Sequence, residues 1–72
     1  MNPETAKAEL KRITDEAIGV GGYVEATNDL REYYIYTECW TLSIEQLDKI
    51  RSKVTITSLS VDGGRIMLTA KI

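Results

Sequence analysis

The segment from Val54 to Ile72 has the sequence VTITSLSVDGGRIMLTAKI, in which two strand-forming runs flank the pair Gly63-Gly64. Tandem glycines accept the positive φ angles that a tight type I′ or II′ hairpin turn requires. A two-residue loop at these glycines pairs Asp62 with Arg65 and sets apolar residues opposite each other on alternate rungs. The segment therefore predicts a β-hairpin with this register, closed by the two-residue loop or its four-residue equivalent, because a slip of one residue would exchange the two faces of a strand.

The two strands of this hairpin differ in regularity. Because successive side chains of a strand point to opposite faces, the second strand separates two sets, Ile66, Leu68, Ala70 and Ile72 on one face and Arg65, Met67, Thr69 and Lys71 on the other. In the first strand, Val54 and Ile56 have the opposite parity to Leu59 and Val61. A β-bulge near Thr57-Ser58 would bring all four apolar side chains to the core face.

Length and composition set limits on the kind of protein. A chain of 72 residues has room for one domain and buries only about 60% of its unfolded surface, so its stability is marginal. Hydrophobic residues at 43% and charged residues at 28% are typical of a folded globular chain, and no apolar run is long enough to span a membrane. A net charge of −2 argues against a protein that depends on phosphate neutralisation. With the lone Cys39 and a charged start of the chain, we expect a reduced, cytoplasmic protein.

Two helices are predicted from capping residues and apolar spacing. Asn2-Pro3-Glu4 has the cap, the proline and the carboxylate of a helix start, and the helix should run to about Ile18, before Gly19. Its apolar stripe consists of Ala6, Leu10, Ile13 and Ala17. A second helix should begin at the capping box Ser43-Ile44-Glu45-Gln46 and end near Lys53. Its apolar face consists of Ile44, Leu47 and Ile50, with Val54 continuing it.

A second hairpin is predicted from Tyr23 to Cys39, with Asn28-Asp29 in its turn. A two-residue loop would set Glu25 opposite Glu32, which is a repulsive pair. A four-residue loop from Asn28 to Arg31 avoids this contact. It turns one set of side chains to the core, Val24, Ala26, Tyr33 and Ile35, and leaves Tyr23, Tyr34 and Tyr36 on the outer face.

These elements follow the order α-β-β-α-β-β, which predicts an α+β fold. Each helix has one apolar stripe, so both helices should cover one face of a four-stranded antiparallel sheet and leave the other face open. Moving the last strand to the front of this order would give the β-α-β-β-α-β arrangement, so the pattern also fits a permuted ferredoxin-like split fold.

The sequence offers little for catalysis. It has no histidine, the commonest general base and metal ligand, and Cys39 has no base beside it in sequence. The pairs Asp15-Glu16 and Asp29 with Glu32 do not have the spacing of a metal site. We therefore expect no enzyme activity, no metal and no cofactor.

The aromatic residues are concentrated between Tyr23 and Trp40. The candidate binding residues lie on the outer face of the sheet and are Tyr23, Tyr34, Tyr36, Trp40, Arg65 and Met67. Tyrosine and tryptophan combine a large rigid apolar surface with a polar tip, which suits interfaces that must also be exposed to water. An alternative is structural, because tyrosines are good strand formers and Trp40 could fill the space under the second helix.

Two functions fit this face. The first is a non-enzymatic protein-protein interaction module, a class that includes small accessory proteins and inhibitors of phages and mobile elements, with an unidentified protein as its partner. The alternative is a single-stranded nucleic-acid-binding protein that stacks bases on the tyrosines, which the acidic balance disfavours. We also expect a homodimer, formed either by stacking of two such faces or by edge pairing of the last strand.

Overall fold

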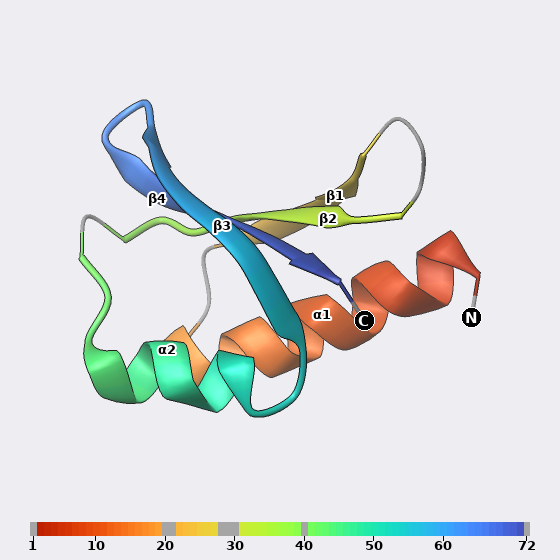
Figure 1. Ribbon diagram of the computed structural model, residues 1–72, viewed down its shortest axis with the longest axis horizontal. Coiled ribbons are helices and arrows are strands. Elements are labelled where there is room, and N and C mark those ends of the chain that lie inside the picture. The colour runs from red at the N-terminus through yellow and green to blue at the C-terminus, as the bar shows by residue number, and fades with distance from the viewer. Residues whose placement is uncertain (1, 20–21, 28–30, 40, 72) are drawn as a thin grey trace.

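The computed structural model describes residues 2–19, 22–27, 31–39 and 41–71. Its elements are α1 (Pro3–Ile18), β1 (Tyr23–Ala26), β2 (Tyr33–Tyr36), α2 (Ile44–Arg51), β3 (Thr55–Asp62) and β4 (Arg65–Lys71). The four strands form one antiparallel sheet in the order β1-β2-β4-β3, and both helices lie on the same side of it (Figure 1). The predicted α+β class and the α-β-β-α-β-β order are confirmed.

The strand order contains a split β-α-β unit. β2 and β3 are both antiparallel to β4, which lies between them, and α2 connects them along the chain. If β4 preceded α1, then β4-α1-β1 would form a second such unit around β2. This is the ferredoxin-like arrangement with one strand moved to the other end of the chain, the permuted form that the element order also fits.

The C-terminal hairpin has the predicted register. Asp62 pairs with Arg65 across the turn, and Gly63 and Gly64 have φ angles of 63° and 83°. Positive φ at both central residues defines a type I′ turn, whose twist matches that of the strands. The register shifts between Ile56 and Ser58, so the predicted bulge is present.

The hairpin of β1 and β2 also has the predicted register, with Val24 opposite Ile35. The Thr27 amide donates to the Glu32 carbonyl at 3.0 Å, which closes a four-residue loop whose residues 28–30 lie outside the described part of the chain.

The prediction that the second strand of this hairpin continues to Cys39 was wrong, because β2 ends at Tyr36. The amide and the hydroxyl of Thr37 both donate to the Ile66 carbonyl. The Ile66 amide, however, donates to the carbonyl of Cys39 and not to that of Thr37. The chain therefore bulges out at Glu38, and the ladder stops there.

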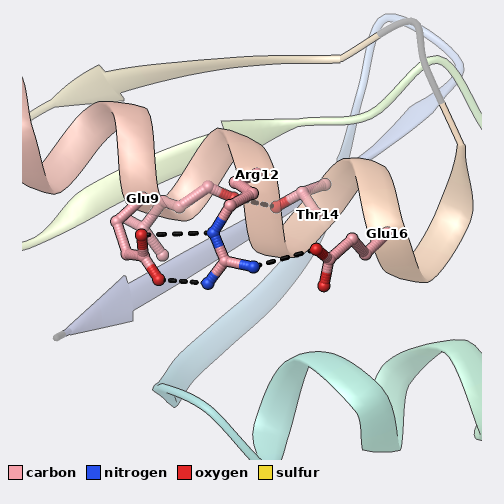
Figure 2. Close-up of polar contacts among 5 residues, drawn as sticks. Glu9, Arg12, Thr14 and Glu16 are labelled. Carbon is pink, nitrogen blue, oxygen red and sulfur yellow. Dashed lines mark hydrogen bonds and ion pairs between the residues drawn. The ribbon is translucent and has the colours of Figure 1, made fainter.

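α1 has the predicted limits and the predicted buried face. Asn2 accepts a capping bond from the Thr5 amide at 2.8 Å, and the stripe of Ala6, Leu10, Ile13 and Ala17 is buried. The Thr14 hydroxyl is also buried, and it donates to the Leu10 carbonyl at 2.8 Å. On the solvent side, Arg12 forms ion pairs with both Glu9 and Glu16, the latter at 2.9 Å (Figure 2).

α2 begins with the predicted capping box, in which Ser43 and Gln46 exchange two bonds of 3.0 and 2.9 Å. The helix ends at Arg51, two residues before the predicted end. Ile44 was wrongly assigned to the buried face, since it is 77% exposed, whereas Ile50 is fully buried. At 3.6 residues per turn, Ile44 lies roughly 120° around the helix from Ile50, which places it on the flank.

The core lies between the helices and the sheet. Tyr33, Ile35, Leu68 and Ala70 are buried there, as predicted. The prediction for β3 was only half right. The bulge does bring Leu59 and Val61 to the helix side of the sheet, opposite Leu68 and Ile66, but these two side chains are 51% and 71% exposed. α1 packs on β1 and β2, and β3 is at the far edge of the sheet, so both side chains stay largely exposed.

The position of β4 corrects a further expectation. The last strand is hydrogen-bonded on both sides, to β2 and to β3, so it has no free edge for pairing with a second molecule. The edge strands are β1 and β3.

Candidate functional site

The candidate site is the side of the sheet opposite the helices. Its central feature, which we call the tyrosine face, consists of Tyr23, Tyr34 and Tyr36 with Arg65 and Met67. β1 contributes the first residue, β2 the next two and β4 the others. The structure therefore brings together five of the six residues that the sequence singled out, while Trp40 lies outside the described residues.

The strand register explains why these side chains meet. Tyr23 lies directly opposite Tyr36, and Tyr36 lies directly opposite Met67, so the three form one row across three strands. Tyr34 lies in the next row, opposite Glu25 and Thr69. Directly opposed side chains are the closest neighbours across a sheet, and they therefore form a continuous surface.

The rings of the tyrosine face contact one another. Tyr23 and Tyr36 are stacked, with 4.7 Å between ring centroids and an interplanar angle of 17°. Tyr34 meets Tyr36 edge to face at 6.2 Å and 63°. Both geometries are favoured by the charge distribution of aromatic rings. Tyr36 is thus held between two neighbours, and the cluster is partly ordered before any partner binds.

Exposure differs across the tyrosine face. Tyr23, on the short edge strand β1, is 43% exposed, whereas Tyr34, Tyr36, Met67 and Arg65 are half-buried. Because α1 and α2 both lie on the opposite side of the sheet, the accessible ring area is available to a partner (Figure 1).

Acidic groups surround the only arginine of the tyrosine face. The Arg65 guanidinium donates to the Glu38 carboxylate at 2.6 Å, and Asp62 is its opposite neighbour in the hairpin. Burial raises the pKa of Tyr36 above its ordinary value of 10.0, and the nearby Tyr23 hydroxyl and Asp62 carboxylate add to this effect. Tyr36 therefore carries a neutral hydroxyl at physiological pH and can donate a hydrogen bond.

One feature was not found from the sequence. An open hollow of about 270 Å³ lies between the two helices, lined by Ile13, Glu16, Ala17, Lys49, Ser52 and Lys53. The available signal was the pair Lys49, on α2, and Lys53, two residues beyond its end, which both line the hollow beside α1. The hollow depends on how the two helices pack, which helical periodicity does not specify.

The described residues include no cluster of three or more cysteine or carboxylate side chains that could hold a metal ion. Cys39 is a free, half-buried thiol. Within the same part of the chain, neither helix combines the length and the apolar character needed to cross a membrane.

Comparison with known proteins gives no relative: no family model, no curated protein and no solved structure matches this chain.

Proposed function

We propose that this protein is a non-enzymatic protein-binding module and that its partner covers the tyrosine face. The observation that carries the proposal is the stack of Tyr23 on Tyr36, with Tyr34 against its edge, on the side of the sheet opposite α1 and α2. Three tyrosines placed together at this position contribute little to the core, which lies on the other side.

The composition of the tyrosine face suits a protein partner. Tyrosine offers a large contact area with only two side-chain torsions to order, and it is enriched among the residues that dominate binding energies. Mutual contacts between the rings restrict those torsions beforehand, which lowers the entropic cost of association. The Arg65–Glu38 ion pair at the margin supplies polar groups of the kind found at interface rims.

Single-stranded nucleic acid is less well supported as the partner. A nucleic-acid site needs free cations for phosphates and free ring faces for bases. Arg65 is paired with Glu38, and one face of Tyr36 is already covered by Tyr23. Glu25 lies opposite Tyr34, which adds negative charge where a backbone would pass.

The experiment compares the double variant Tyr34→Ser, Tyr36→Ser with the wild type in affinity capture from a lysate. Ile44→Ser is the matched control, because it removes an exposed apolar side chain from α2, on the helix side of the sheet. Circular dichroism first establishes that both variants are folded. We expect the double variant to lose a protein that the wild type and Ile44→Ser both retain.

Two results would count against the proposal. If the folded double variant captures the same proteins in the same amounts as the wild type, the tyrosine face is not the binding surface. If short single-stranded oligonucleotides quench tyrosine emission at low salt, and the double variant abolishes this effect, the partner is nucleic acid instead.

A further inference from the structure

The open edge of β3 is a second surface, distinct from the tyrosine face. We propose that β3 pairs antiparallel with β3 of a second copy of this chain about a twofold axis at Ser60, which joins two four-stranded sheets into one of eight strands. This inference concerns self-association and stands or fails independently of the proposed partner of the tyrosine face.

The first argument is that β3 lacks the usual protection of an edge strand. Natural edge strands are kept from pairing by short length, charged side chains, proline or β-bulges. The other edge, β1, is four residues long and contains Glu25. β3 has eight residues and contains neither a charged residue nor proline before Asp62 at its end. The bulge at Thr57 interrupts only its first half, so the segment from Ser58 to Asp62 remains regular.

The second argument comes from the orientation of backbone groups. The Ile66 amide donates to the Cys39 carbonyl, and the Ile66 carbonyl accepts from Thr37, so both groups point away from β3. Ile66 and Val61 are therefore a non-hydrogen-bonded pair of the antiparallel ladder. It follows that the N–H and C=O of Val61 point outward, to the open edge, and those of Leu59, two residues earlier, do the same.

The third argument is that one register satisfies these groups and the exposed side chains together. When Ser60 lies opposite the Ser60 of the partner subunit, each Leu59 lies opposite a Val61 across the axis. These are the residues with outward N–H and C=O groups, so both pairs are hydrogen-bonded pairs. Their side chains are on the helix side of the sheet, where Leu59 and Val61 are 51% and 71% exposed in the single chain.

Other registers are less favourable. Shifts by one residue set the apolar face of one strand against the polar face of the other. A register centred on Leu59 sets Val61 opposite the bulged Thr57, and a register centred on Val61 sets Leu59 opposite Gly63 of the turn. The Ser60-centred register also places Asp62 opposite Ser58. The two Asp62 carboxylates are then about 14 Å apart along the strands, beyond the screening length of about 8 Å at physiological salt.

The test uses cysteine cross-linking at the proposed axis, in a Cys39→Ser background so that each variant has one thiol. Ser60→Cys places two thiols on a non-hydrogen-bonded pair, where the Cα atoms are about 4.5 Å apart and a disulfide can form. Ser58→Cys is the matched control, because it is an exposed serine on the same strand and the same face, two residues away. We expect Ser60→Cys to form the covalent dimer at least roughly tenfold faster under mild oxidation, because the axis holds its two thiols together.

Mass in solution provides the second readout, without any covalent link. At high micromolar concentration the wild type should approach twice its mass of 8.1 kDa. Val61→Lys should return it to the monomer, whereas Ile44→Lys, a charge at an equally exposed position on α2, should leave the dimer intact. A wild-type monomer at that concentration, equal cross-linking of the two cysteine variants, or a dimer lost in Met67→Glu but kept in Val61→Lys would each overturn the proposal.

Discussion

Leu59 and Leu68 lie opposite each other on the same rung of the β3–β4 hairpin and on the same face, yet they should differ in what they contribute to stability. Leu68 is fully buried and Leu59 is 51% exposed. Removing a buried leucine side chain costs about 2–5 kcal/mol, because a cavity adds to the lost transfer free energy. At Leu59 no cavity is created. The three carbon groups that Leu59→Ala removes have a transfer free energy of roughly 2.4 kcal/mol when fully buried, and Leu59 realises about half of it. Leu59→Ala should therefore cost about 1 kcal/mol.

The assay is urea unfolding of Leu68→Ala and Leu59→Ala, at a dilution where light scattering gives the monomer mass. A chain of 72 residues should have a free energy of unfolding of about 4–11 kcal/mol, so Leu68→Ala removes a large share of it. The slope of the unfolding free energy against urea should stay the same in both variants. Equal losses in the two variants would refute the reasoning, because they would mean that Leu59 is covered in the single chain.

Two further predictions concern pH. The pKa of Tyr36 is raised in the folded protein, so the stability that its neutral form provides is complete below pH 10.0 and is lost as pH rises through the raised value. Thermal unfolding at a series of alkaline pH values should show a smaller loss of stability in Tyr36→Phe than in the wild type. The hydrogen bonds from Arg12 hold the pKa of Glu9 below its ordinary value of 4.5. The contribution of the Glu9 carboxylate to stability is therefore present above pH 4.5 and lost as pH falls through the lowered pKa. Glu9→Gln should weaken the dependence of unfolding on acid pH. An unchanged dependence of stability on pH would show that the Glu9–Arg12 pair adds nothing to stability.

Most of the fold could be predicted because local signals agreed with one another. The tandem glycines set the register of β3 and β4, the repulsion between Glu25 and Glu32 selected the four-residue loop, and capping residues located both helix starts. The same local register also placed Tyr23 opposite Tyr36, so five residues of the candidate site could be named before the structure was known.

Two of the errors, at Leu59 and at Ile44, concern which side chains are covered. Side-chain parity places Leu59 on the helix side of the sheet, but it does not say whether a helix extends that far. Likewise, the apolar character of Ile44 favoured the buried face, although its angle around α2 placed it on the flank. Strand order was also undetermined by sequence, and for that reason β4 was treated as a free edge. Only the long-range pairing of β2 with β4 excludes this.

The central claim is that the tyrosine face binds a protein, and the most direct test is a calorimetric titration of the captured partner, once purified, into three forms of the chain. The wild type and Ile44→Ser should bind with equal affinity. The double variant Tyr34→Ser, Tyr36→Ser should bind at least about 30-fold more weakly, the equivalent of one interface hot spot of about 2 kcal/mol. Wild-type affinity in a double variant that is folded by circular dichroism would contradict the claim.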